Sequence, residues 1–124
     1  MKDYDELSGK VIGCAIEVHR ALGPGLLESA YEKCLSSELS ANNIRHCVQK
    51  ELPIKYKNIE LDCNYRIDFL IEDKLIVELK SVDAILPIYE AQILTYMKLT
   101  CVKTGLLINF NVRLLRDGIK RFIL

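Results

Sequence analysis

The spacing of apolar residues predicts two helices at the start of the chain. Over residues 6–22 apolar side chains recur every three or four positions, as on the buried face of a helix. The Gly-Pro-Gly stretch at 23–25 ends this helix, and the same spacing resumes from residue 26 to about residue 39. The sequence therefore predicts two helices joined by a tight elbow.

After residue 44 the spacing changes to the alternation that is typical of strands. Three segments separated by polar turns carry this alternation: 47–57, 59–72 and 75–80. We expect them to form an antiparallel meander of three or four strands.

A third helix and two more strands complete the predicted elements. Pro87 precedes the helical stretch 88–99, and a proline is harmless in the first turn because its missing N–H has no partner there. An apolar strand follows at 104–110, and the Asp-Gly pair at 117–118 turns the chain into a last strand at 119–124. This order predicts an α+β or α/β fold in which helices cover a mixed sheet.

Composition narrows the class of protein. The chain has 124 residues, enough for one domain spanning 1–124, and half of them are hydrophobic. Lys plus Arg (17) equals Asp plus Glu (17), so any contact with nucleic acid must come from a local patch of positive charge. We expect neither a signal peptide nor a membrane span, and we predict a cytoplasmic protein.

The five cysteines carry no metal-binding or redox pattern. They are widely spaced and contain no C-x-x-C pair. We expect them to be reduced and mostly buried thiols. The five are Cys14, Cys34, Cys47, Cys63 and Cys101.

Candidate chemistry lies in the stretch YRIDFLIEDKLIVELKS at 65–81, where charged residues interrupt two strands. If the turn between the strands has three residues, 72–74, then Asp68 lies opposite Glu78 and one face of the hairpin is wholly apolar. A two-residue turn would place charges among the apolar side chains, at a high desolvation cost. We therefore predict the three-residue turn.

The predicted register brings two carboxylates together, and like charges directly across a strand pair are destabilising without a cation. Mg²⁺ prefers oxygen ligands and commonly takes one or two carboxylates, so Asp68 and Glu78 could form half of a metal site. Lys80 shares the face of Glu78 and could assist a metal-bound water. The alternative is a solvated charged face, in which Arg66 and Lys80 neutralise the two acids.

These residues resemble a known family. An acid in one strand followed about ten residues later by Glu-Leu-Lys at 78–80 is similar to the motif of the PD-(D/E)XK nuclease superfamily. More narrowly, GLLESAY at 25–31 and its context resemble the GxxExxY proteins along nearly the whole chain. The resemblance implies a restriction-endonuclease-like core.

The resemblance also implies roles for particular residues. It makes Asp68, Glu78 and Glu28 metal-binding acids, the Leu79 carbonyl a further ligand, and Lys80 the catalytic lysine. Two residues of the third helix would lie beside the active site: Gln92 and Tyr96. The implied cofactor is Mg²⁺ or Mn²⁺, and the implied partner is nucleic acid, DNA in preference to RNA.

The residues alone allow simpler explanations. Glu28 near a helix start is favoured by the helix dipole, and Gln92 could be a polar anchor among aromatic residues. His19 on the apolar face of the first helix is more often a hydrogen-bonded core residue than a ligand. Six cations could contact phosphates or simply face solvent: Lys55, Lys57, Arg113, Arg116, Lys120 and Arg121.

Two functions follow. The first is a metal-dependent phosphodiesterase acting on nucleic acid. The second is a nuclease-fold module that binds nucleic acid or a protein without cutting it, because 124 residues leave little room for recognition insertions. The apolar end of the chain also makes a homodimer a reasonable expectation.

Overall fold

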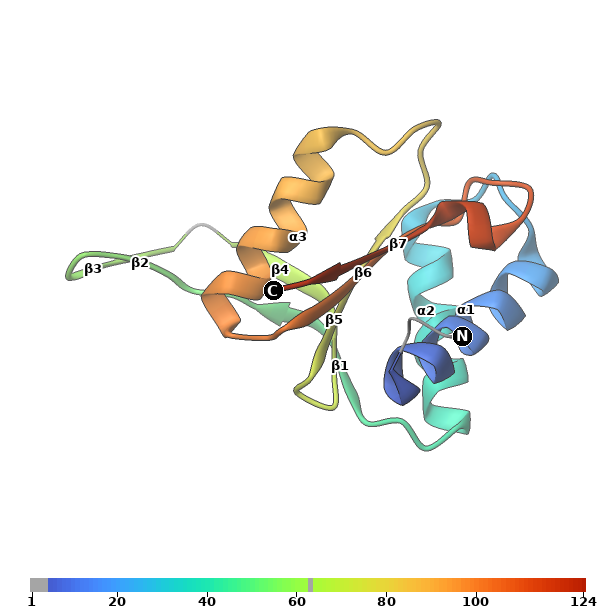
Figure 1. The fold of residues 1–124 in the computed structure, drawn as a ribbon, viewed down its shortest axis with the longest axis horizontal. Coiled ribbons are helices and arrows are strands. Elements are labelled where there is room, and N and C mark those ends of the chain that lie inside the picture. The colour runs from blue at the N-terminus through green and yellow to red at the C-terminus, as the bar shows by residue number, and fades with distance from the viewer. Residues whose placement is uncertain (1–4, 63) are drawn as a thin grey trace.

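A five-stranded mixed sheet forms the centre of the protein, in a computed structural model that describes residues 5–62 and 64–124 (Figure 1). The helices are α1 (Glu6–Leu22), α2 (Glu28–Ala41) and α3 (Pro87–Thr100), and the short 3₁₀ turn is η1 (Leu115–Gly118). The strands of the sheet, in their spatial order, are β1 (His46–Glu51), β4 (Arg66–Ile71), β5 (Leu75–Lys80), β6 (Thr104–Asn109) and β7 (Ile119–Ile123). This arrangement confirms the predicted fold of helices covering a mixed sheet.

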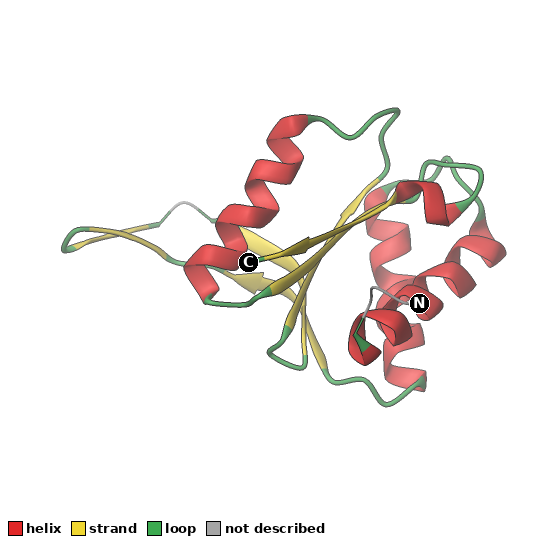
Figure 2. Cartoon of the chain, in the orientation of Figure 1, coloured by secondary structure: helices red, strands yellow, loops and turns green. Residues whose placement is uncertain are grey.

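Helices cover both faces of the sheet, as Figure 2 shows. Helices α1 and α2 pack on one face, where Val11 and Tyr31 join Phe69 and Val77 in a buried cluster. Helix α3 covers the other face, where its Ile93 belongs to a second cluster. Each face of the sheet therefore has its own apolar core.

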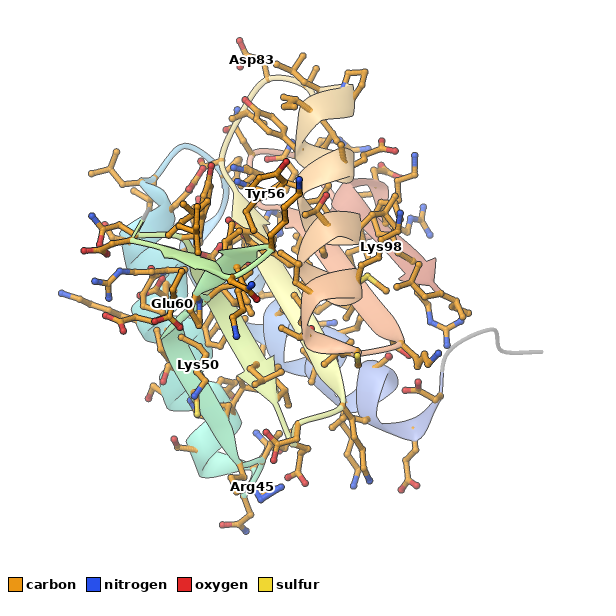
Figure 3. The ribbon with its side chains drawn as sticks, turned by 90° about the vertical axis from the view of Figure 1, so that its left-hand side faces the viewer. Arg45, Lys50, Tyr56, Glu60, Asp83 and Lys98 are labelled. Carbon is orange, nitrogen blue, oxygen red and sulfur yellow. The ribbon has the colours of Figure 1, made fainter. Side chains whose placement is uncertain are left out.

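The strand directions bring several chain segments to one end of the sheet. Strands β4 and β5 are antiparallel, so the start of β4 lies beside the end of β5. Strands β5 and β6 are parallel, and Lys80 pairs with Asn109 at their ends. We call this the site end; Figure 3 shows Asp83, just after β5, far from Arg45, just before β1.

The predicted antiparallel meander is present as β1, β4 and β5, but it contains an insertion that the sequence did not predict. Strand β1 pairs with β4, and the segment between them forms a separate two-stranded hairpin from β2 (Ile54–Tyr56) and β3 (Ile59–Leu61). The Leu52 N–H donates to the Tyr65 carbonyl at 2.9 Å and closes the base of this excursion. The hairpin projects away from the rest of the molecule (Figure 1).

The turn between β4 and β5 has the predicted three residues, 72–74, and pairs Ile71 with Leu75 and Phe69 with Val77. A wholly apolar hairpin face, as predicted, would place Ile67 on the same side of β4 as Phe69, and this part of the prediction is wrong. Ile67 packs with Ile93 in the cluster beneath α3, because the ladder of β4 and β5 ends at Phe69 and the alternation changes there.

The remaining boundaries follow their local signals. Asp5 caps α1 by accepting a hydrogen bond from the Ser8 N–H at 2.7 Å, and Pro87 occupies the first turn of α3 as predicted. Strand β6 is flanked on both sides, which suits its apolar sequence. Within the described residues, none of the helices combines the length and apolarity that crossing a membrane requires.

The cysteines are less buried than expected. Cys14 is buried and Cys34 half-buried, but Cys47 and Cys101 are exposed, and all four are free thiols. Cys47 is exposed because it lies in an edge strand, and Cys101 because it ends α3. Cys63 lies outside the described residues.

Candidate active site

Two carboxylates lie where β4 and β5 stop pairing through their backbones. The Asp68 N–H donates to Glu78 Oε2 at 2.9 Å, and the Leu79 N–H donates to Asp68 Oδ2 at 2.8 Å. Side-chain oxygens therefore replace backbone carbonyls as acceptors at this point. The pair is brought together as the predicted register requires.

The two carboxylates are held in a poorly solvated position. Glu78 is only 5% exposed, and burial, followed by repulsion from Asp68, raises its pKa to about 8. Burial also raises the pKa of Asp68, although hydrogen bonds from Leu79 and Gln49 act in the opposite direction. Negative charge is thus costly here in the absence of a cation.

Lys80 supplies positive charge near the pair without forming an ion pair with it. Its Nζ lies 4.3 Å from the centroid of the Tyr89 ring on α3, in a cation–π contact. Its charge favours the ionised forms of both Asp68 and Glu78. The ammonium is therefore held beside α3 and close enough to influence the carboxylates.

Helix α3 carries two of the predicted side chains, and Tyr96 is the one that lies close to the carboxylates. Tyr96 is 5% exposed and packs edge-on against Tyr65, with ring centroids 6.5 Å apart. Burial and the nearby charges of Glu78 and Asp68 raise the pKa of Tyr96 to about 12, so its hydroxyl stays protonated. Gln92 is half-buried one helical turn earlier on α3.

Glu28 reaches the site end from the elbow between α1 and α2. Its Oε2 accepts a hydrogen bond from the Ser81 N–H at 3.2 Å, and the Ser81 hydroxyl donates to the Leu26 carbonyl at 2.6 Å. Its charge adds to the repulsion that raises the pKa of Glu78. The structure thus places Glu28 near the pair but bonded to the backbone beyond β5.

The GLLESAY stretch has a structural explanation in this elbow. Gly25 has a φ of +97°, which glycine adopts at little cost. The hydroxyl of the fully buried Tyr31 donates to the Gly23 carbonyl at 2.6 Å and accepts from the Leu26 N–H at 3.1 Å. Gly25 and Tyr31 therefore fix the loop from which Glu28 extends.

Two residues at the site were not foreseen from the sequence. The Gln49 side-chain amide donates to Asp68 Oδ1 at 3.0 Å and to Glu32 Oε1 at 2.6 Å. Glu32 lies one turn after Glu28 on α2, and this i, i+4 spacing was the available signal. Gln49 gives no such signal, because only the pairing of β1 with β4 brings it beside Asp68.

Several other candidates have ordinary structural roles. The His19 Nε2 hydrogen-bonds the Val112 carbonyl at 2.8 Å, as expected of a core histidine. Lys120 pairs with Glu90 at 2.9 Å, and Arg121 pairs with Asp5 at 3.6 Å. Lys55 lies in β2 and Lys57 in the turn that follows it, so both belong to the projecting hairpin, on which Figure 3 labels Tyr56.

Comparison with known proteins agrees with this geometry. The family model of the PD-(D/E)XK nuclease superfamily matches residues 5–122, nearly the whole chain. The chain belongs to the PD-(D/E)XK nuclease superfamily. No curated protein and no solved structure matched it. Superfamily membership supports nuclease-like activity and implies a nucleic-acid substrate.

PD-(D/E)XK nucleases generally use divalent metals such as Mg²⁺ or Mn²⁺. Within the part of the chain that the structure describes, no three Asp, Glu, His or Cys side chains converge as a metal-binding group. The donor set is instead the pair Asp68 and Glu78, and Mg²⁺ commonly takes one or two carboxylates while keeping several waters. The pair fits such a cation, since a positive charge would offset the repulsion between the buried Glu78 and the half-buried Asp68.

Proposed function

We propose that the chain is a metal-dependent phosphodiesterase that cleaves nucleic acid at the site of Asp68 and Glu78. The observation that carries the proposal is that each of these two poorly solvated carboxylates is fixed by a backbone N–H of the other residue's strand. Glu78 accepts from the Asp68 N–H at 2.9 Å, and Asp68 accepts from the Leu79 N–H at 2.8 Å. A fixed pair of oxygen ligands is what a hard divalent cation requires. Superfamily membership supports the same chemistry.

Each nearby residue has a proposed task. Asp68, Glu78 and the Leu79 carbonyl hold the cation, with Glu28 supporting it from the elbow. A bound divalent cation would polarise the phosphodiester and acidify a coordinated water. Lys80 would orient the attacking water or stabilise the negative charge that develops on the phosphate.

Helix α3 would contact the substrate rather than the cation. The Tyr96 hydroxyl remains a donor at neutral pH because the pKa of this residue is raised to about 12. Among the described residues, Gln92 has no hydrogen-bond partner, so its amide is available to a phosphate oxygen. Both side chains would therefore position the phosphodiester.

Calorimetric titration of Mg²⁺ and Mn²⁺ into metal-stripped protein tests the proposal. Asp68→Asn/Glu78→Gln should abolish binding, since it removes both charges with little change in shape. The matched control Glu60→Gln/Asp73→Asn removes two exposed carboxylates elsewhere and should bind like the unmodified protein. Binding that survives in the site variant, with and without added oligonucleotide, would contradict the proposal.

A second candidate function is a nuclease-fold module that binds nucleic acid or a protein without cutting it. The small number of acidic ligands favours this candidate, because within the described residues no third Asp, Glu, His or Cys side chain joins Asp68 and Glu78 in a metal-binding group. Salt-sensitive binding of DNA or RNA, without cleavage in Mg²⁺ or Mn²⁺, would support this second function over the first.

Four finer assignments complete the proposal. We place the chain among the GxxExxY proteins, because Gly25, Glu28 and Tyr31 together build the elbow. We expect DNA in preference to RNA, a cytoplasmic location, and a homodimer through the edge strand β7, where Ile123 is 64% exposed. Cleavage assays on both polymers, localisation of a tagged chain, and sedimentation would test the last three.

A further inference from the structure

A hollow lined by arginines lies beside the elbow between α1 and α2. It is bounded on one side by the end of α1 with Gly23 and Pro24, and on the other by the loop after β6. The basic residues in its lining are His19, Arg20, Arg113 and Arg116. We call it the arginine hollow.

The arginine hollow differs from two other hollows on the described surface in the charge of its lining residues. A hollow at the base of the β2–β3 hairpin contains three acids and no cation among its lining residues. A hollow between α1 and α2 contains Glu17 and Glu38 with Lys10. The arginine hollow has three guanidinium groups and no acidic lining residue, so it is suited to an anion.

Ordinary structural roles account for only part of this charge. Arg20 lies in the last turn of α1, where the helix dipole favours a cation, and it pairs with Glu17 at 3.7 Å. Arg113 and Arg116 are exposed, and neither forms an ion pair with another described residue. Their guanidinium groups therefore remain available to a ligand.

The arginine hollow lies at the site end of the sheet. Asn109 ends β6 beside Lys80, and its side chain exchanges hydrogen bonds with the backbone of Val82. Three residues later, the Val112 carbonyl accepts from His19 of α1. The elbow itself contacts Ser81 through Leu26. Hydrogen bonds thus join the two residues that follow β5 to Leu26 in the elbow and to Asn109 before the loop, close to the two walls of the hollow.

We propose that the arginine hollow binds a phosphate group of the nucleic acid whose cleavage is assigned above to Asp68 and Glu78. Guanidinium groups match phosphate oxygens in charge and in bidentate geometry. The inference rests on the proposed function for the identity of the ligand. It also explains how a chain without net charge can hold a polyanion: the positive charge is concentrated at one place.

Anisotropy of fluorescein-labelled single-stranded and duplex DNA, titrated with the full chain in EDTA, tests this inference without cleavage. Arg113→Ala/Arg116→Ala should weaken binding roughly tenfold at low salt. It should also reduce the slope of log affinity against log salt by about 1.5, since each lost phosphate contact removes about 0.7–0.9. Arg113→Lys/Arg116→Lys keeps both charges and should retain most of the slope.

The matched control is Lys74→Ala/Lys98→Ala. It removes two exposed cations, one in the turn opposite the site end and one on α3 (Figure 3), and should change neither affinity nor slope by as much. Oligonucleotides with and without a 5′-phosphate then distinguish a terminal phosphate from an internal one. A preference of the unmodified protein for the phosphorylated end, lost in the alanine variant, assigns the hollow to the terminus; equal binding assigns it to the backbone.

Failure of this inference can be told from failure of the proposed function. If the alanine variant binds like the control, or if the unmodified protein binds no DNA in EDTA, the hollow is not a phosphate site. Cation-dependent cleavage that is lost in Asp68→Asn would still uphold the proposed function. The opposite result is also distinguishable. If the unmodified protein binds DNA more tightly than the alanine variant but cleaves it with no cation, the hollow is upheld as a phosphate site and the proposed function is contradicted.

Discussion

Gln49 has an unusual backbone for a residue inside a strand. Its φ is +54°, a left-handed conformation that costs a non-glycine residue roughly 1–2 kcal/mol. The register of β1 against β4 is the same on both sides of it, so no residue is inserted. Strain of this kind persists where the surroundings impose it, often at functional sites. Here the side-chain amide gains contacts with both Asp68 and Glu32.

Two substitutions separate the strain at Gln49 from its hydrogen bonds. Gln49→Ala loses both bonds to carboxylates and keeps the strain, so its unfolding free energy should fall by about 2 kcal/mol. Gln49→Gly loses the same bonds but relieves the strain, and should be more stable than the alanine variant by about 1 kcal/mol. Urea denaturation measures both. An alanine variant more stable than the glycine variant would refute the strain.

The raised pKa of Glu78 predicts how the stability of metal-stripped protein depends on pH. The pKa of this carboxyl is about 8 in the folded chain against an ordinary value of 4.5, so between these values the folded state binds more protons than the unfolded state. Stability should therefore fall as pH rises from about 4.5 to 8, by at most about 5 kcal/mol, at roughly 1.4 kcal/mol per pKa unit.

Glu78→Gln cannot ionise and should lack this part of the pH dependence. Denaturation at several pH values in EDTA, for both proteins, measures the difference. Added Mg²⁺ should flatten the curve of the unmodified protein, because a bound cation favours the ionised carboxylate. Parallel curves for the two proteins in EDTA would show that Glu78 ionises normally.

At the scale of single elements, helix α2 depends on the elbow that precedes it. Tyr31 is fully buried, stacks on Phe110 with ring centroids 4.4 Å apart, and bonds the elbow through its hydroxyl. Because this hydroxyl satisfies backbone groups of the loop next to Glu28, it couples the apolar core to the site end.

Tyr31→Phe should lower the unfolding free energy by about 1–3 kcal/mol, since it leaves the Gly23 carbonyl without its donor. Amide exchange over residues 23–28 should also become faster. Tyr56→Phe removes an exposed hydroxyl from the hairpin and should change stability by less than about 0.5 kcal/mol. Equal stability of the two variants would show that the Tyr31 hydroxyl does not hold the elbow.

The elements that local signals define were predictable from the sequence. The helices follow from apolar spacing, and the turn at 72–74 follows from the cost of burying charge, which also placed Asp68 beside Glu78. The partner of β1 was not predictable, because a short hairpin and a longer meander have similar local patterns. Gln49 and the arginine hollow depend on contacts between distant segments, and no local pattern reveals them.

At the scale of the whole molecule, the sheet separates two apolar cores, and members of both lie beside the candidate site. The cluster beneath α1 and α2 holds Phe69 and Leu79, and the cluster beneath α3 holds Ile67 and Tyr96. In β4, Asp68 lies between Ile67 and Phe69, one from each cluster. In β5, Glu78 is followed by Leu79 of the cluster beneath α1 and α2. The candidate site is therefore supported from both faces of the sheet, whereas the β2–β3 hairpin contributes no residue to either core.

Replacement of residues 54–61 by a two-residue Asn-Gly turn tests this independence of the hairpin. The described apolar clusters and the Leu52–Tyr65 hydrogen bond remain, so the thermal midpoint should fall by only a few degrees, corresponding to about 1 kcal/mol or less. Mg²⁺ binding should be retained. Unfolding of the shortened chain would mean that the hairpin is required for the sheet.

The closed base of the hairpin also bears on how fast the chain can fold. Pairing β1 with β4 requires the chain to close a loop between Leu52 and Tyr65, and loop closure carries an entropic cost that grows with length. Strands β2 and β3 pair across a turn of two residues, 57–58, a local event on the microsecond scale. If they pair first, they bring the ends of that loop together. The β2–β3 hairpin, which contributes no residue to either apolar cluster, would then speed the pairing of β1 with β4.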